Sequence, residues 1–173
     1  MIAFAFSFPA GRYHATPWGR HVNEADVAWP PEPVRILRAL IATWWRKADH
    51  ERFPKIMLDG LIDALAAEPP VFRLPEAVHT HVRAFMPAPM DRKLIYDAFL
   101  RFDRDAELIA AWPSVTLTAE QEALAAHLLE RIGYLGRAES WAEGRIASDH
   151  LLNHVVSEGV DLLDRVGEVR IER

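Results

Sequence analysis

The sequence predicts an α+β domain in which an antiparallel sheet is covered by two main helices. Segments whose apolar residues recur every second position alternate along the chain with segments that have a helical period. Their order is strand, helix, strand, strand, helix, strand, which is the split βαβ order of the ferredoxin-like fold. The chain has 173 residues, half of them hydrophobic, and this suffices for one such domain.

The N-terminal third contains the first strand and two helices. Residues 1–8 alternate, so that the aromatic side chains of Phe4, Phe6 and Phe8 share one face of a strand. A helix begins near Pro33, because prolines suit a first helical turn, and an apolar stripe follows it. A shorter helix is expected over residues 54–67.

The centre of the chain changes to a two-residue period. Residues 78–86 and 94–102 predict two antiparallel strands joined by a connection with two prolines, and residues 106–112 are expected to extend the sheet by a short strand. Thr118 and Gln121 fit a capping box that opens a helix ending at Gly133.

The C-terminal part divides the chain into a domain and a tail. Residues 141–147 predict the last strand of the domain, so we expect a domain over residues 1–147. Residues 148–173 form a separate C-terminal segment with a helical pattern.

Composition excludes several classes of function. The net charge is −5, but residues 1–60 carry eight Lys and Arg against six Asp and Glu, so any basic patch belongs to this first third. The absence of cysteine excludes disulfides and thiolate metal sites and suits the cytoplasm. No apolar run reaches the roughly 20 residues of a membrane span, and the N-terminus lacks the basic start of a secretory signal. We therefore expect a cytoplasmic protein with no membrane partner.

The loop after the first strand is rich in polar and aromatic chemistry. Arginines bind phosphates and aromatic rings stack on unpaired bases, a combination typical of single-stranded RNA recognition. Two interpretations stay open beside it: a surface loop that folds back on the core, and a metal-free RNA cleavage in which His14 and His21 act as general acid and base. The candidate RNA contacts in this loop are Arg12, Tyr13, His14, Trp18, Arg20 and His21.

Three further groups of residues are candidates for binding. Arg35 and Arg38 lie on the first helix, and we include them among the RNA contacts. Residues 133–140, GYLGRAES, bring Gly133, Gly136 and Arg137 into a turn that could approach an anion closely, although a helix cap explains the same pattern. The alternating run at residues 79–83 suits a solvated or RNA-facing strand better than a metal, so no metal and no cofactor are expected.

Several longer motifs together resemble the Csb-two proteins of type I-U (also called I-G) CRISPR systems. They follow one another within residues 1–146 and read GRYHATPWGRHVNE, WPPEPVRILRALIATWWRK, HTHVRAFMP, LIYDAF and GYLGRAESWAE. Proteins of this family belong to the repeat-associated (RAMP) superfamily and fuse a Cas-five-like module to a Cas-six-like module. The chain resembles the N-terminal, Cas-five-like module only.

The resemblance implies a ferredoxin-like (RRM-like) RAMP domain that binds RNA in a type I CRISPR surveillance (Cascade) complex. Such a subunit holds the 5′ handle of the crRNA and contacts the backbone and large subunits in antiviral defence. The Cas-six-like module is not among the 173 residues, so a non-catalytic role is the favoured expectation. The alternatives are a metal-independent endoribonuclease that processes pre-crRNA and a truncated protein-interaction module.

Overall fold

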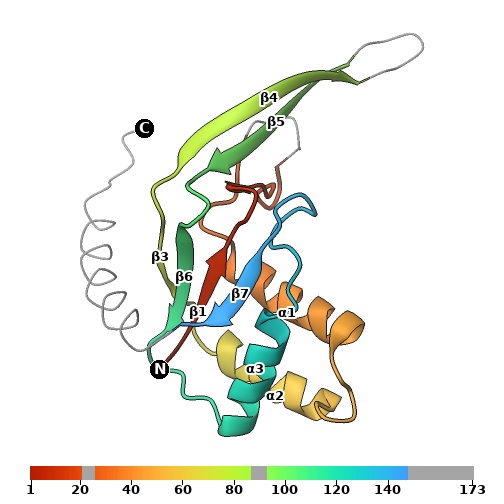
Figure 1. The fold of residues 1–173 in the computed structure, drawn as a ribbon, viewed down its shortest axis with the longest axis vertical. Coiled ribbons are helices and arrows are strands. Elements are labelled where there is room, and N and C mark those ends of the chain that lie inside the picture. Colours follow the sequence, from red (N-terminus) through yellow and green to blue (C-terminus); the bar gives the residue numbers. More distant parts are fainter. Residues whose placement is uncertain (21–25, 87–92, 148–173) are drawn as a thin grey trace.

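The computed structural model describes residues 1–20, 26–86 and 93–147 of the chain (Figure 1). The candidate His21 and the tail predicted over residues 148–173 therefore lie outside the described residues. In chain order the elements are β1 (Ile2–Ser7), β2 (Arg12–Tyr13), α1 (Pro33–Lys47), α2 (Lys55–Ala66), β3 (Val71–Arg73), β4 (Val78–Met86), β5 (Lys93–Arg101), β6 (Glu107–Trp112), α3 (Ala119–Leu129) and β7 (Glu143–Ile146).

Four strands form one antiparallel sheet in the order β3-β6-β1-β7. The central strands β1 and β6 pair from Ile2 opposite Trp112 to Ser7 opposite Glu107. Because β3 follows the first two helices and β7 follows α3, the strand order is that of the split βαβ arrangement. The predicted α+β class with a ferredoxin-like sheet is confirmed.

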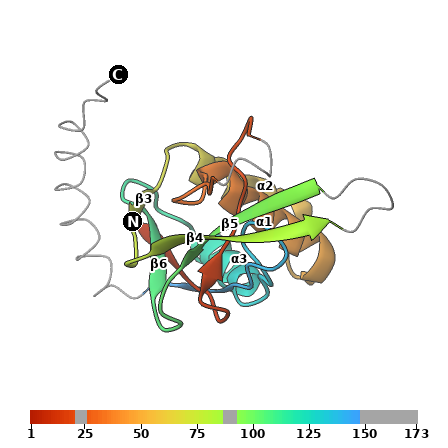
Figure 2. The same cartoon turned by 90° about the horizontal axis from the view of Figure 1, so that it is seen from above.

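The prediction of which strands build this sheet was wrong. Strands β4 and β5 were expected in it, but they form a separate three-stranded sheet of order β2-β5-β4, whose hairpin extends beyond the main sheet (Figures 1 and 2). The edge position belongs to the three-residue strand β3, and β6 is central rather than an extension. Burial explains the difference: residues 108–112 are all buried, as in a strand covered on both faces, whereas Val78, Val82 and Phe85 of β4 are exposed.

In the described part of the chain, the predicted helices α1, α2 and α3 lie on the same side of the four-stranded sheet (Figure 1). The Trp112 ring packs against Phe4 at a centroid distance of 5.1 Å, and its Nε1 donates to the carbonyl of Leu65 at 3.0 Å, which ties the sheet to α2. The predicted capping box is present: Thr118 and Gln121 bond reciprocally at the start of α3. Among the described residues, no helix is long and apolar enough to cross a membrane.

Candidate nucleic-acid interface

The loop after β1 and the glycine-rich segment at residues 133–140 lie against each other. The carbonyl of His14 accepts a hydrogen bond from the Arg137 amide at 2.8 Å. The hydroxyl of Ser140, which is fully buried, accepts from the His14 amide at 2.8 Å and donates to the His14 carbonyl at 3.1 Å. Two segments separated by more than a hundred residues in sequence thus form one structural unit.

Gly136 is the residue that permits this approach. Its φ is +95°, and a Cβ at this position would lie 2.5 Å from the carbonyl oxygen of His14, closer than real Cβ contacts allow. From the sequence, this glycine was expected either to let an anion approach closely or to belong to a helix cap and turn. The structure accounts for it by the approach of the N-terminal loop.

The side chain of His14 is buried between two carboxylates. Its Nδ1 lies 2.9 Å from Glu139 Oε1 and its Nε2 lies 3.2 Å from Asp97 Oδ1, while only 4% of the side chain is exposed. We call His14, Asp97 and Glu139 the His14 clamp, because it joins the N-terminal loop, strand β5 and the glycine-rich segment. The two carboxylates were not predicted, since nothing in their local sequence distinguishes them from surface acids.

The guanidinium group of Arg137 interacts with the charged groups of the clamp. Burial lowers the pKa of His14, and Arg137 lowers it further, while the carboxylates of Asp97 and Glu139 raise it. Arg137 Nη1 lies 3.3 Å from Asp97 Oδ1, and its Nη2 donates to the Thr16 hydroxyl at 3.0 Å. The predicted RNA contact Arg137 is therefore engaged in holding the clamp and the loop together.

The clamp also offers the atoms of a metal site. One ligand atom from each of its three residues lies within 4.8 Å of the others, the one such group in the described part of the chain. The carboxylates, however, contact opposite nitrogens of the ring, and one ion cannot lie in line with both. Arg137 already supplies positive charge beside Asp97. Hydrogen bonds and ion pairs thus account for the arrangement.

Tyr13, another predicted RNA contact, belongs to the core. Its side chain is fully buried and packs against Phe8 and Trp29 at centroid distances of 5.6 and 5.1 Å. Burial raises the pKa of the phenol, so the hydroxyl stays protonated at all physiological pH values. Neither Tyr13 nor His14 presents its side chain to solvent in this structure.

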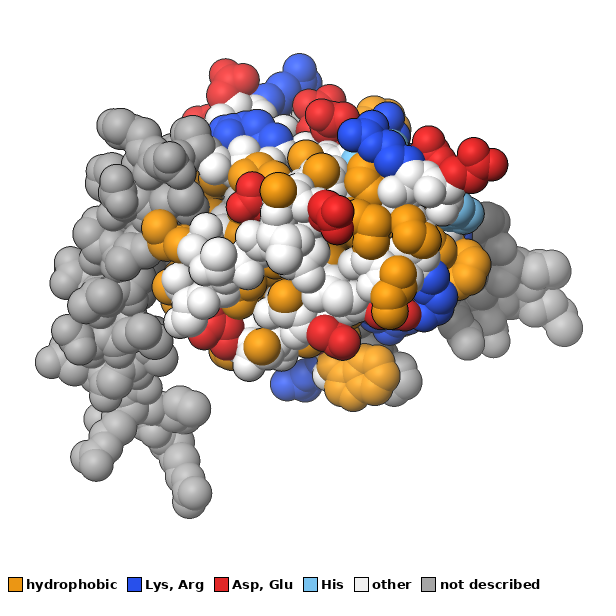
Figure 3. Space-filling view, turned by 90° about the horizontal axis from the view of Figure 1, so that it is seen from below, with side chains coloured by type: hydrophobic (Ala, Val, Ile, Leu, Met, Phe, Trp, Pro, Cys, Tyr) orange, Lys and Arg blue, Asp and Glu red, His pale blue; other side chains and the backbone are white. Residues whose placement is uncertain are grey.

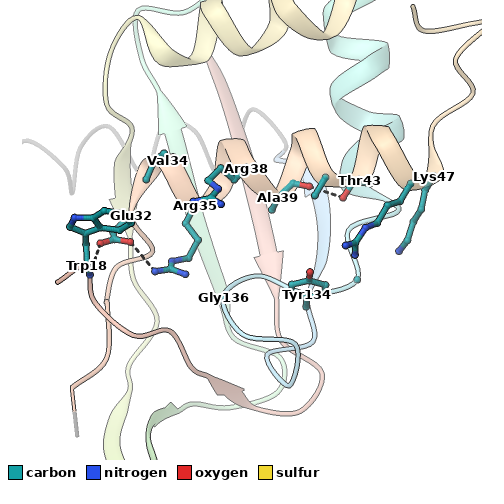
Figure 4. Close-up of a pocket in the computed structure, with 13 residues that line it drawn as sticks. Trp18, Glu32, Val34, Arg35, Arg38, Ala39, Thr43, Lys47, Tyr134 and Gly136 are labelled. Carbon is teal, nitrogen blue, oxygen red and sulfur yellow. Dashed lines mark hydrogen bonds and ion pairs between the residues drawn. The ribbon is translucent and has the colours of Figure 1, made fainter. Parts of the chain in front are cut away.

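A cleft of about 660 Å³ separates α1 from the glycine-rich segment (Figure 4). Five of the predicted RNA contacts line it: Trp18, Arg35, Arg38, Gly133 and Gly136. Arg12 and Arg20 are exposed but do not line it, and neither does Arg137, which contacts the clamp through Asp97. The structure thus brings together the predicted contacts on α1, at the end of the N-terminal loop and at the two glycines.

The walls of the cleft are strongly basic. Arg46 and Lys47 line it beside Arg35 and Arg38, and they were not among the predicted contacts although the spacing from Arg38 to Arg46 is two helical i+4 steps. One carboxylate, that of Glu32, faces these four cations and lies 2.9 Å from Arg35 Nη2.

Not all of these four cations form an ion pair with another described residue. Lys47 Nζ donates to the carbonyl of Arg131 at 2.7 Å, while Arg38 and Arg46 have no ion-pair partner among the described residues. On the end of the molecule that carries α2 and α3, by contrast, acidic, basic and apolar side chains are interspersed (Figure 3). Four cations and one carboxylate line the cleft, so the cleft carries a net positive charge that attracts anions.

Comparison with known proteins gives one distant structural likeness to report. No family model matches the chain, and no curated protein matches it. Among solved structures the chain is similar to Thermus thermophilus Cas6, with 14% sequence identity and a TM-score of 0.40, over 82% of this chain and 52% of that one. The chain therefore spans about half the length of that structure, and a likeness at this level does not assign it to the Csb-two family.

Proposed function

We propose that the chain is a non-catalytic RNA-binding subunit of a type I CRISPR surveillance complex, and that the cleft along α1 holds the crRNA 5′ handle. The observation that carries the proposal is that Arg38 and Arg46, which form no ion pair within residues 1–20, 26–86 and 93–147, line a cleft that also presents an exposed Trp18. Arginine forks bind phosphate oxygens, and an exposed indole stacks on an unpaired base.

The charge distribution supports a local rather than a general affinity for RNA. The chain as a whole carries −5, so sequence-independent attraction over its entire surface is weak. Four cations against one carboxylate in the cleft reverse that sign locally. An acidic subunit that binds RNA at one place suits an assembly in which other subunits hold the rest of the strand.

The geometry favours binding over cleavage. A general base must come within hydrogen-bond reach of the 2′-hydroxyl that it activates. No histidine lines the cleft among the described residues, and both nitrogens of the buried His14 face carboxylates. The type I-U (I-G) assignment, the contacts with backbone and large subunits and the cytoplasmic location belong to the proposal through the resemblance of the motifs.

The proposal is tested by RNA affinity at graded salt. We expect a fluorescein-labelled single-stranded oligouridine to bind with an affinity that falls as salt rises. Arg38→Ala should weaken binding and reduce the salt slope by about 1, because one phosphate contact is lost. The matched control is Arg104→Ala, an exposed arginine in the turn before β6 that does not line the cleft. An affinity that does not change with salt, or equal effects of the two variants, would refute RNA binding in the cleft. The protein-interaction module would then be the remaining alternative for the function of the chain.

The same preparation tests the enzymatic alternative. Incubation of the protein with repeat RNA in EDTA between pH 5 and pH 9 should leave the RNA intact. Cleavage that is lost in His14→Ala would overturn the non-catalytic assignment.

A further inference from the structure

Two exposed aromatic residues line the cleft at separate places along α1. Trp18 lies beside Glu32 and Val34 at the start of α1, and Tyr134 lies near Thr43 and Lys47 toward its end (Figure 4). The Trp18 side chain is 89% exposed, the highest value among the large apolar residues described, and Tyr134 is 41% exposed. Their position on the walls of one basic cleft, rather than exposure alone, suggests that the two rings belong to a contact surface.

The cations of the cleft lie between and beside these rings. Arg35 extends from α1 into the space between Trp18 and Tyr134, and Arg38 lines the cleft beside it on the helix (Figure 4). From Val34 to Lys47 the helix is about 20 Å long at 1.5 Å per residue. The cleft is therefore an elongated path with Trp18 at one end, Tyr134 farther along it, and cationic side chains between and beyond the two rings.

We infer that this path is a track for unpaired nucleotides, in which one base stacks on Trp18, another stacks on Tyr134, and the phosphates between them contact Arg35 and Arg38. The inference rests on the proposed function and adds the form of RNA that the site takes. At about 3.4 Å per stacked nucleotide, 20 Å holds about six nucleotides, and fewer when the strand is extended. A paired strand offers no free base face along its length, so the track selects single-stranded RNA.

The position of Tyr134 follows from the fold and not from the cleft alone. Residues 134 and 141 form an isolated antiparallel bridge, and the segment beyond Tyr134 is held to the N-terminal loop at Arg137 and Ser140. Trp18 belongs to that same loop, and its amide donates to Glu32 Oε1 at 3.4 Å. The two rings are thus mounted on segments that are bonded to each other, which fixes the spacing between them.

An abasic ligand separates stacking from phosphate binding. We expect an oligouridine of about six nucleotides to bind the full chain at least about fivefold more tightly than an abasic oligomer of equal length and charge. Equal affinities for the two ligands would overturn the track while leaving phosphate binding, and hence the proposed function, in place. Failure of both ligands to bind would refute the proposed function itself.

Substitutions assign the stacking to the two rings. Trp18→Ala and Tyr134→Ala should each lose at least about fivefold in affinity for oligouridine and little for the abasic oligomer, while Tyr134→Phe retains the ring and the affinity. Trp45→Ala is the matched control, because Trp45 is 58% exposed on α1 but does not line the cleft. Thermal melts of each variant verify folding. A loss for Trp45→Ala as large as that for Trp18→Ala, or equal losses on both ligands, would overturn the inference.

Discussion

Replacement of Gly136 by alanine tests the contact between the N-terminal loop and the glycine-rich segment. A residue with a Cβ loses about 1–2 kcal/mol in the left-handed region of φ. The added carbon, 2.5 Å from the His14 carbonyl, also forces the segments apart. Loss of the Arg137 amide bond to that carbonyl costs about 1 kcal/mol more. We therefore expect Gly136→Ala to lower the free energy of unfolding by about 2–4 kcal/mol.

The control for this substitution is Gly19→Ala. Gly19 also has a positive φ, +76°, but a Cβ there would meet no atom within 4 Å. Both variants lose the same freedom in the unfolded chain, so the difference between them isolates the close approach to His14. Urea denaturation followed by circular dichroism measures both. If the two variants lose equal stability, the contact between the segments does not contribute as argued.

Two further predictions concern buried rings. Burial lowers the pKa of His14 below 6.5, so the unfolded chain binds a proton at this residue more readily than the folded chain does. The contribution of His14 to the free energy of unfolding is therefore fully present above pH 6.5. It is lost as the pH falls toward the folded-state pKa. His14→Asn should flatten the urea midpoint between about pH 7 and pH 5, and a wild-type profile that is already flat would contradict this. Trp44→Ala should cost about 3–5 kcal/mol in the same assay, since its buried ring donates from Nε1 to the carbonyl of Phe53 at 2.9 Å. Trp45→Ala, on the exposed side, should change stability by less than about 0.5 kcal/mol, and similar losses in both would refute this assignment of faces.

The sequence predicted the elements of the fold better than their positions in the sheets. Periodicity locates β4 and β5 correctly, because their side chains alternate, but the period does not state which sheet a strand joins. Strand β3 has three residues and too few positions to show any period. The continuous apolar run of β6 does indicate a central strand. The prediction nevertheless gave the central positions to β4 and β5, because these two strands are longer and alternate clearly.

For the candidate site, local sequence could predict residue types but not the direction of each side chain. The short strand β2 pairs with β5 and places Tyr13 in the core, a contact across almost ninety residues that no local pattern shows. His14 is held inside by Asp97 and Glu139, which are as distant in sequence. Arg35 and Arg38 were predicted from their place on an amphipathic helix, where direction follows from the 3.6-residue period. Both helical candidates therefore line the cleft, while the loop candidates divide between the core, the exposed surface and the cleft.

That division gives the N-terminal loop two roles in one short stretch. His14 holds the glycine-rich segment through Glu139 and through its own backbone, and four residues later Trp18 faces the cleft. The glycine-rich segment repeats the arrangement, with Tyr134 at the cleft and Arg137 in contact with the loop. Each segment thus presents one aromatic ring and anchors the other segment. Because His14 and Ser140 are buried at this junction while the two rings are exposed, the spacing of the rings depends on residues that need not touch RNA at all.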